Sequence, residues 1–304
     1  MKIGFAGLGR MGLNMCRRAL HGGHEVVAWN RSFDKTKTLA DEAGAKPAQT
    51  LSEMVASLAA PRTVWVMLPA GQTTDAVITE LSKLLDRGDL IIDGSNGYYK
   101  EDIRRFAELE KKGIAYMDAG VSGGIWGLER GYCIMTGGRE DDFARVEPFI
   151  KTLCADKGYL HCGPHGSGHF VKMVHNGIEY AMMEAYGEGF EILKASQFGK
   201  ELDMPAIAAL WNQGSVVRSW LLELLESALK KDPGLKTVEG YVDDSGEGRW
   251  TVEQAVETGV PAHAITAALF KRFSSREHNA FSDRILAALR REFGGHAIKP
   301  GDGK

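Results

Sequence analysis

Residues 2–12 read Lys-Ile-Gly-Phe-Ala-Gly-Leu-Gly-Arg-Met-Gly, and this stretch decides the fold of the N-terminal part of the chain. The apolar run Lys2–Ala6 predicts a strand, and Gly7-Leu8-Gly9-Arg10-Met11-Gly12 follows it with the pattern G-x-G-x-x-G. A helix is expected to continue as far as His21, and a second strand is expected over Glu25–Trp29. A strand, this glycine pattern, a helix and a second strand in that order are the fingerprint of a dinucleotide-binding fold.

Each glycine of the motif has an expected role toward a bound dinucleotide. The first makes a tight turn, the second lets the backbone approach the pyrophosphate, and the third lets helix and strand pack closely. Backbone N–H groups at the start of the helix then meet the phosphates. A simple glycine turn is the alternative. We expect the cofactor to contact Gly7, Leu8, Gly9, Arg10, Met11 and Gly12.

The residues after the second strand bear on which nicotinamide dinucleotide fits. An acidic residue there would bind the ribose 2′-hydroxyl of NAD, but this chain has Asn30-Arg31-Ser32 and its first acid at Asp34. A guanidinium beside an amide and a hydroxyl suits the 2′-phosphate of NADP. The pattern favours NADP over NAD. In the alternative interpretation, Asn30 and Ser32 only cap the next helix.

Length, charge and cysteine usage exclude several classes of protein. The 304 residues suffice for two domains, and the net charge of −3 provides no basic surface for nucleic acid or for a membrane. No apolar run approaches the roughly 20 residues that cross a bilayer, and a strand pattern begins too early to leave room for a signal peptide. The four cysteines form no CxxC pair. We expect a cytoplasmic protein with reduced thiols and neither nucleic-acid nor membrane partners.

The alternation of strands and helices continues to about residue 163. Further strands are predicted at Val64–Leu68, Leu90–Asp93, Ile114–Asp118, Tyr132–Thr136 and Tyr159–Cys162. Ligands of open parallel sheets bind outside the carboxyl ends of the strands, where loops of small residues follow here. The loop residues expected at the cofactor are Leu68, Pro69, Ala70 and Asn96. Ser122-Gly123-Gly124 offers a hydroxyl and unobstructed N–H groups to a substrate carboxylate, with a flexible turn as the alternative.

After this point the pattern is helical, with long apolar-periodic runs such as Ile207–Leu229 and Phe281–Phe293. We therefore predict an α/β, Rossmann-like, NADP-binding domain over residues 1–163. An all-α domain for substrate binding and oligomerisation is predicted over residues 164–304. The segment Lys231–Glu247, rich in Asp, Gly and Lys, predicts a long exposed loop.

The segment His169–Tyr180 predicts an unusual helix near the domain boundary, with Ser167 as its N-cap. Its polar residues occur at i, i+3, i+4, i+7 and i+8 and so share one helical face: Lys172, His175, Asn176, Glu179 and Tyr180. A second face at the same spacing is apolar: Val171, Val174, Ile178 and Met182. We interpret this as a buried helix whose apolar face packs in a core and whose polar face lines a cleft. A partly exposed helix with a mixed face is the alternative.

A group of histidines and a cysteine just before and within this helix invites a zinc interpretation: His161, Cys162, His165 and His169. Their spacing matches no standard structural zinc site, and the Gly-Pro linker among them argues against a rigid cage. We expect no metal.

With these motifs assembled, the chain resembles the decarboxylating 6-phosphogluconate dehydrogenases in their short bacterial form, within the β-hydroxyacid dehydrogenase superfamily. The resemblance covers nearly the whole length. It implies oxidation of 6-phosphogluconate by NADP or NAD, with release of carbon dioxide and ribulose 5-phosphate. Its most specific stretches are Met67-Leu68-Pro69-Ala70-Gly71, Asp93-Gly94-Ser95-Asn96, Ser122-Gly123-Gly124-Ile125-Trp126-Gly127, Lys172–Tyr180, Phe270–Ser275 and Arg290–His296.

The resemblance assigns acid–base roles to two residues of the polar face. Lys172 corresponds to the family's general base, so its pKa must fall toward neutrality, and once protonated it can donate to the carbonyl group that forms. Glu179 corresponds to the acid that protonates carbon 1 of the enediol left by decarboxylation. A β-keto acid needs only a proton donor at its carbonyl, so the scheme implies no metal.

The resemblance also implies a substrate site shared between subunits. Tyr180 and Arg272 would bind the phosphate. Arg290 and His296 match residues that the family contributes from a neighbouring subunit, which implies a dimer or tetramer. The residues implied at the carboxylate and hydroxyls are Asn96, Ser122, Gly123, Gly124, His175 and Asn176.

One departure from the family concerns the phosphate. Long-chain members have a lysine and a threonine where this chain has Ser245 and Glu247, and a glutamate beside a phosphate dianion is unfavourable. Either that loop lies elsewhere, or Arg249 takes over, or the substrate differs. Two other functions stay open. A 3-hydroxyisobutyrate-type 3-hydroxyacid dehydrogenase would use Lys172 without a phosphate clamp, and a cofactor-binding protein would lack catalysis altogether.

Overall fold

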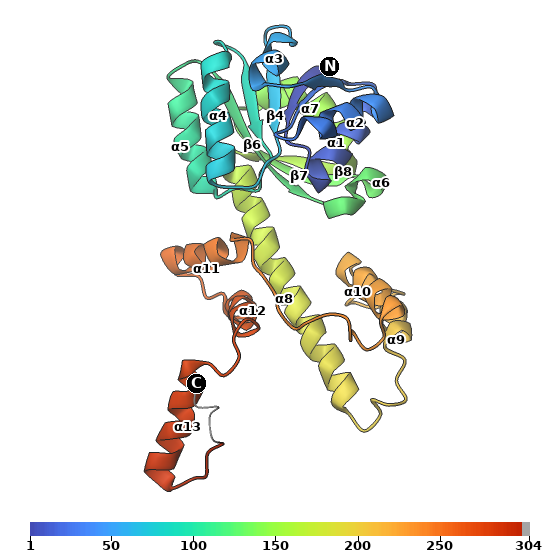
Figure 1. Cartoon of the computed structure of the whole chain (residues 1–304), viewed down its shortest axis with the longest axis vertical. Coiled ribbons are helices and arrows are strands. Elements are labelled where there is room, and N and C mark those ends of the chain that lie inside the picture. The colour runs from blue at the N-terminus through green and yellow to red at the C-terminus, as the bar shows by residue number, and fades with distance from the viewer. Residues whose placement is uncertain (300–304) are drawn as a thin grey trace. The chain divides into compact units, whose positions relative to one another are not determined.

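The computed structural model describes residues 1–299, and the chain divides into two compact units, Met1–Asn176 and Gly177–Lys304. The first unit is α/β and the second is helical, which confirms the predicted fold class (Figure 1). The dividing point lies inside helix α8 (Ser167–Ala195), whereas the predicted boundary precedes this helix. The boundary at residue 163 therefore stays a prediction.

The first unit is built on one eight-stranded sheet in the order β3-β2-β1-β4-β5-β6-β7-β8. All neighbouring strands are parallel except β6 and β7. Chain order reverses between β1 and β4, which is the switch point where open α/β sheets bind ligands. The strands are β1 (Lys2–Ala6), β2 (Glu25–Trp29), β3 (Lys46–Ala48), β4 (Thr63–Val66), β5 (Leu90–Asp93), β6 (Ala115–Ser122), β7 (Tyr132–Gly137) and β8 (Cys154–Gly163).

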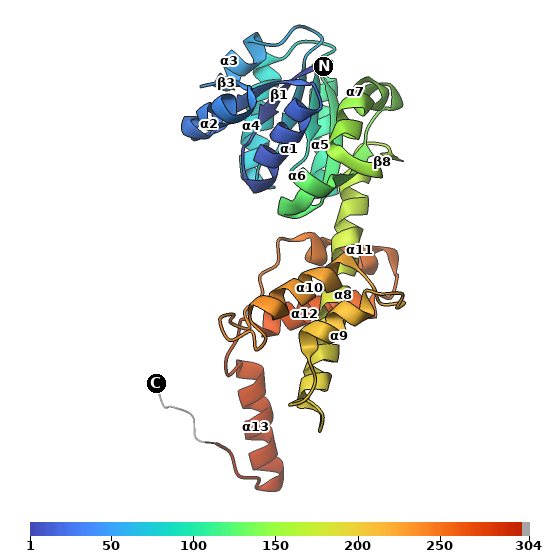
Figure 2. The same ribbon diagram turned by 90° about the vertical axis from the view of Figure 1, so that its right-hand side faces the viewer.

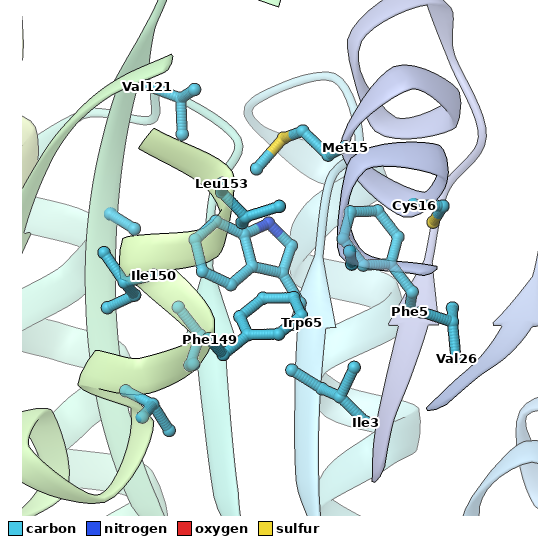
Figure 3. Packing of buried hydrophobic residues seen from close by; sticks show 14 of the residues in the cluster. Ile3, Phe5, Met15, Cys16, Val26, Trp65, Val121, Phe149, Ile150 and Leu153 are labelled. Carbon is cyan, nitrogen blue, oxygen red and sulfur yellow. The ribbon is translucent and has the colours of Figure 1, made fainter. Parts of the chain in front are cut away.

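Helices cover both faces of this sheet because its central strands are apolar on both sides. On one face α1 and α7 enclose Trp65, whose ring centroid lies 6.3 Å from that of Phe5 and 5.9 Å from that of Phe149 (Figure 3). On the other face α3, α4 and α5 pack in a second core. The bounds are α1 (Arg10–His21), α2 (Phe33–Ala43), α3 (Leu51–Ala56), α4 (Gln72–Leu84), α5 (Tyr99–Glu110), η1 (Gly124–Trp126), α6 (Gly127–Arg130) and α7 (Glu140–Leu153).

Two strands are longer than the sequence predicts. Strand β6 extends past Asp118 to Ser122, because the added residues pair with antiparallel β7, Ala119 opposite Thr136 and Ser122 opposite Cys133. The small residues there predict a loop, and a pairing partner further along the chain overrides that local preference. Strand β8 likewise begins five residues before the predicted Tyr159, and the three-residue strand β3 has no counterpart in the prediction.

The second unit contains the C-terminal part of α8 and five further helices. The predicted run Ile207–Leu229 is broken, because Gly214 has a φ of +74° and Ser219 Oγ accepts from the N–H of Leu222 at 3.1 Å to cap a new helix. Residues 232–246 of the loop predicted over Lys231–Glu247 form no helix or strand, but Lys231 ends α10 and Glu247 begins α11 and is buried. Within residues 1–299 no helix combines the length and apolar character needed to cross a membrane. The helices are α9 (Met204–Trp211), α10 (Trp220–Lys231), α11 (Glu247–Thr258), α12 (His263–Ser274) and α13 (Phe281–Gly294).

Helix α8 is one unbroken helix (Figure 1 and Figure 2). Its apolar face, however, is more exposed than predicted. Lys172 of the polar face is only 4% exposed and Tyr180 only 6%. The predicted core face is instead exposed, with Val171 at 40%, Ile178 at 51% and Met182 at 37%. The other polar residues of this face, His175, Asn176 and Glu179, are partly buried. The apolar face is left largely uncovered in the single chain.

Candidate active site

The glycine motif forms a cradle with one open position. A Cβ on Gly7, whose φ is +110°, would lie 2.3 Å from Met67 O, and a Cβ on Gly12 would lie 2.2 Å from Gly7 O. Gly9 has no atom within 4 Å of such a Cβ. The first and third glycines are therefore required by packing, and the second faces open space at the start of α1. This geometry fits the pyrophosphate of a dinucleotide.

Asn30 ties the end of β2 to this cradle. Its Oδ1 accepts a hydrogen bond from Leu8 N at 2.9 Å, and its Nδ2 donates to Ser32 O at 3.1 Å. Ser32 occupies the N-cap position of α2, but its hydroxyl makes no capping hydrogen bond. Arg31 and Ser32 are both exposed. The prediction that Asn30 and Ser32 cap the next helix is therefore wrong, because neither side chain makes a capping hydrogen bond to α2.

Asn96 links the ends of two strands. It has a φ of +56°, and its side chain accepts from Val121 N at 2.8 Å and donates to Val121 O at 3.0 Å. This pairing holds the loop after β5 against the last residues of β6, next to Ser122. Gly123 and Gly124 follow with φ values of +131° and +53°, which favour glycine. The structure thus brings Asn96 and the Ser122–Gly124 turn together, as predicted.

Lys172 lies against the same strand. A Cβ on Gly120 would come within 2.3 Å of Lys172 Cβ. Because Gly120 has no side chain, α8 can pack directly against β6. Lys172 Nζ donates a short hydrogen bond to Asn176 Oδ1, and His175 Nδ1 lies 3.0 Å from the same oxygen. An amine, an amide and an imidazole are therefore joined near the carboxyl end of β6.

Asp118, rather than Ser167, caps the start of α8. Its Oδ1 accepts from Gly166 N at 2.6 Å and its Oδ2 from His169 N at 2.8 Å, while Ser167 Oγ is buried without a hydrogen-bond partner. The prediction of a Ser167 cap is wrong because a carboxylate from the sheet already satisfies these N–H groups. Burial, assisted by the charge of Asp102, raises the pKa of Asp118 to about 6.

In the second unit, the structure brings together the residues predicted to bind phosphate from this chain. The Arg272 guanidinium lies 3.5 Å from the centroid of the Tyr180 ring and donates to Asp243 O at 2.7 Å. The N–H of Ser245 points to Tyr180 Oη at 3.4 Å. A cation, a phenol and a backbone donor therefore form one cluster.

The departure from the family is part of this cluster. The bond from Ser245 N to Tyr180 Oη places this loop at the cluster, and Ser245 Oγ donates to the buried carboxylate of Glu247 at 2.5 Å. Arg249 is held by Asp244, at 2.7 and 3.1 Å, and Arg276 lies 2.6 Å from the same carboxylate. The hydrogen bond from Arg249 and then that from Arg276 lower the pKa of Asp244 to about 2. Arg249 thus already has a carboxylate partner.

Other predicted site residues are not joined to this cluster within one chain. Arg290 lies on α13, a helix that buries no side chain, and His296 follows it. The histidines considered for zinc have other contacts: His161 donates toward Gly138 O at 3.0 Å, and His165 stacks on Phe106 with 3.5 Å between ring centroids.

Sequence reasoning missed the buried charges beneath the site. Asp93, Asp102 and Asp118 are 0% exposed, and His169 lies beside them. The sequence pattern suggests for His169 only the role of a zinc ligand. The sequence did carry a signal: Asp93 and Asp118 each end a predicted apolar strand. A carboxylate buried at such a place requires a buried partner.

Together, this fold and the buried lysine define a dinucleotide-dependent oxidoreductase. The chain matches the NAD binding domain of 6-phosphogluconate dehydrogenase over residues 2–163 and the 6-phosphogluconate dehydrogenase C-terminal domain over residues 168–294. It is 45% identical over 302 residues to the Bacillus subtilis (strain 168) protein YqeC, covering 98% of this chain and 99% of that protein. It is 42% identical over 300 residues to the NAD(+)-dependent, decarboxylating 6-phosphogluconate dehydrogenase of Haloferax volcanii, covering 98% of each.

One similar solved structure is of the same family, and another shows only the shared fold. Plasmodium falciparum 6-phosphogluconate dehydrogenase superposes with a TM-score of 0.83 at 28% identity, over 100% of this chain and 67% of that one. The Mycobacterium tuberculosis 3-hydroxyisobutyrate dehydrogenase shares the fold, with a TM-score of 0.72 at 22% identity over 95% of this chain and 99% of that one. The chain belongs to the 6-phosphogluconate dehydrogenase family.

Proposed function

We propose that this protein oxidises and decarboxylates 6-phosphogluconate to ribulose 5-phosphate and carbon dioxide, with NADP as the preferred hydride acceptor. The observation that carries the proposal is Lys172, a buried amine held against Gly120 near the carboxyl end of the sheet. The full-length similarity to a decarboxylating 6-phosphogluconate dehydrogenase supports this substrate.

A nicotinamide dinucleotide, when bound, supplies the hydride acceptor. The open cradle at Gly9 would hold its pyrophosphate, and the loops at Leu68–Ala70 and Asn96 would flank its nicotinamide half. Arg31 and Ser32, both exposed beside Asn30, support a 2′-phosphate and so NADP. The Haloferax volcanii relative is named as NAD(+)-dependent, which keeps NAD as the alternative.

Lys172 would act first as base and then as acid. As a neutral amine it takes the proton of the substrate hydroxyl while the hydride leaves. Its ammonium form then donates to the new carbonyl oxygen, which accepts the electron pair released when carbon dioxide departs. The hydrogen bond to Asn176 Oδ1 fixes the direction of the amine. Glu179, seven residues later on α8 and about 10 Å along its axis, would protonate carbon 1 of the enediol.

The two ends of the substrate would be bound by different groups. Ser122, Gly123, Gly124, His175 and Asn176 would hold the carboxylate and hydroxyls, as the family resemblance implies. Tyr180, Arg272 and the N–H of Ser245 would bind the phosphate, since all three can donate to it or stabilise its charge.

Self-association would complete the site. The exposed apolar residues of α8, and α13 with its exposed Phe281, Leu289 and Phe293, offer surfaces that a second copy would cover. We propose that Arg290 and His296 of that copy reach the phosphate. Mixing inactive Lys172→Ala and Arg290→Ala proteins under subunit exchange should restore part of the activity, because some shared sites regain both residues. No recovery in exchanged mixed oligomers would contradict a shared site.

A substrate panel tests the reaction. The purified protein should form reduced cofactor and carbon dioxide in equal amounts from 6-phosphogluconate, and Lys172→Ala should abolish turnover while NADP still binds. Oxidation of unphosphorylated 3-hydroxyacids without carbon dioxide would favour the 3-hydroxyisobutyrate type. Cofactor binding without turnover of any substrate would identify a non-catalytic protein.

A further inference from the structure

A buried ion pair lies one helical turn before Lys172. His169 is 1% exposed, and its Nδ1 lies 2.7 Å from Oδ2 of the fully buried Asp102 on α5. Burial alone lowers the pKa of His169, but the charge of Asp102 and their hydrogen bond raise it to about 9. The carboxylate of Asp102 thus favours the protonated form of the imidazole. Its position at i−3 from Lys172 places it on the buried face of α8.

This pair continues into a network that ends at the Asn96 loop. The Tyr116 hydroxyl lies 2.7 Å from Asp102 Oδ1 and 3.2 Å from Asp93 Oδ2. Arg105 donates to Asp93 Oδ2 at 2.9 Å, and the other oxygen of Asp93 accepts from Ser95 N at 2.9 Å. The contacts thus run from α8 through α5 and β6 to Asp93 at the end of β5, and on to Ser95, one residue before Asn96.

The same end of α8 has little freedom to shift. Asp118 accepts from the backbone of Gly166 and His169, and a Cβ on Gly168 would lie 2.5 Å from Met135 O. Backbone contacts of this kind fix how closely the helix approaches the sheet. Side-chain contacts add to them, and the buried His169–Asp102 hydrogen bond ties this turn of α8 to α5.

A cation site is the competing interpretation of these residues. One ligand atom from each of Asp93, Asp102 and His169 lies within 4.8 Å of the others. Arg105, however, is already 2.9 Å from Asp93 Oδ2 and 3.7 Å from Asp102 Oδ1. Because the Arg105 guanidinium and the His169 imidazole already bond these carboxylates, a divalent ion would have to displace them and would be repelled by the guanidinium.

We propose that His169 and Asp102 are positioning residues, which hold Lys172 in register with the Asn96 loop and so align the base with the substrate. The inference rests on the proposed role of Lys172. His169 Nε2 is buried without a hydrogen-bond partner, so the specific contact is the one at Nδ1. Loss of that contact lets α8 rotate, and misplacement of a catalytic group by about 1 Å lowers turnover by roughly 100-fold.

Two substitutions of His169 separate positioning from bulk packing. In His169→Asn the amide nitrogen takes the place of Nδ1 and can still donate to Asp102, whereas in His169→Gln the amide reaches the place of Nε2. We expect His169→Gln and Asp102→Asn to lower kcat for 6-phosphogluconate by roughly 10- to 100-fold. The Kd for NADP should change less than about twofold, and His169→Asn should recover most of the lost kcat.

His165→Gln is the matched control, because His165 stacks on Phe106 and contacts Tyr116 at its backbone, away from the hydroxyl that bonds Asp102, so its replacement should leave kcat unchanged. Circular dichroism checks folding, and Tyr116→Phe, which removes one hydroxyl from Asp102, replaces any variant that does not fold. Equal impairment of His169→Asn and His169→Gln, or normal kcat in both, would overturn the positioning role. Normal turnover by Lys172→Ala would instead remove the proposed function, and this inference with it.

Discussion

Gly120 lies directly beneath Lys172: a Cβ on the glycine would come within 2.3 Å of the Cβ of the lysine. The close approach explains how a lysine of α8 can be buried against β6. Without a side chain at residue 120, the helix backbone reaches the sheet and the lysine stem lies flat against the strand. The amine is then left at the carboxyl end of β6, where Asn176 accepts its hydrogen bond.

Gly120→Ala should therefore impair both stability and turnover. The added methyl meets Lys172 Cβ and, at 2.9 Å, Gly168 O, and backbone atoms cannot move aside cheaply. We expect a loss of about 1–3 kcal/mol in the free energy of unfolding and a lower kcat. Urea unfolding and steady-state kinetics measure these. Gly189→Ala, also on α8 but in open space, should be neutral or slightly stabilising. Equal effects of the two substitutions would contradict this account.

Glu179→Gln should slow turnover more than it weakens substrate binding. The amide cannot deliver a proton to carbon 1, so kcat should fall by roughly 100-fold or more while KM changes little. Glu188→Gln, at an exposed position of the same helix, is the control and should leave both constants unchanged. A Glu179→Gln protein with wild-type kcat would rule out the acid role.

Arg31→Ala should discriminate between the two cofactors. Removing the guanidinium takes away the partner proposed for the 2′-phosphate, so KM for NADP should rise roughly tenfold or more while KM for NAD stays nearly constant. Lys35→Ala, an exposed cation on the adjoining helix, should change either KM only slightly. Equal increases with both cofactors would show that Arg31 does not read the 2′-phosphate.

The sequence predicts the elements whose periodicity is local and strong. The glycine motif, strands β1, β2 and β5, and helix α1 lie where the pattern places them. The C-terminal end of β6 could not be predicted, because its small residues favour a loop and only pairing with β7 makes them a strand.

The faces of α8 show a second limit of sequence patterns. Apolar spacing indicates which residues share a face, but it does not reveal whether the chain itself covers that face. Here Gly120 and Asp118 allow a lysine and a histidine to be buried, while Val171 and Ile178 stay exposed. The family resemblance names Lys172 and Glu179 but gives no indication of the His169–Asp102 pair, which depends on residues 67 positions apart.

Glu247→Gln should strengthen binding of the phosphorylated substrate. The amide keeps an acceptor for Ser245 Oγ but removes a buried carboxylate from beside the proposed phosphate donors. Relief of that repulsion should lower KM for 6-phosphogluconate, by about tenfold if roughly 1.4 kcal/mol is recovered. Glu253→Gln, exposed on the same helix, should have no such effect. A higher KM would mean that Glu247 contributes to binding and does not oppose it.

The His169–Asp102 pair should make stability depend on pH above neutrality. The pKa of His169 rises from 6.5 to about 9 on folding, so the folded state binds an extra proton between these values. Its stabilisation is present below pH 6.5 and is lost as pH rises through 9, with a slope of up to about 1.4 kcal/mol per pH unit. The pKa of Asp118 is raised from 3.8 to about 6, so its contribution to stability is also lost as pH rises, but in the lower window of pH 3.8 to 6.

Urea unfolding from pH 6.5 to 9 measures the contribution of His169. The charged and titratable groups that face it are Asp93, Asp102, Arg105, Tyr116 and Asp118, and they also affect how the free energy of unfolding changes with pH. The contribution of His169 is therefore the slope of wild type minus the slope of His169→Gln. His165→Gln is the control, because burial lowers the pKa of His165 and its contribution changes below pH 6.5 instead. The slope should disappear in His169→Gln and persist in His165→Gln. A wild-type slope equal to that of His169→Gln would show that the imidazole is neutral in the folded protein.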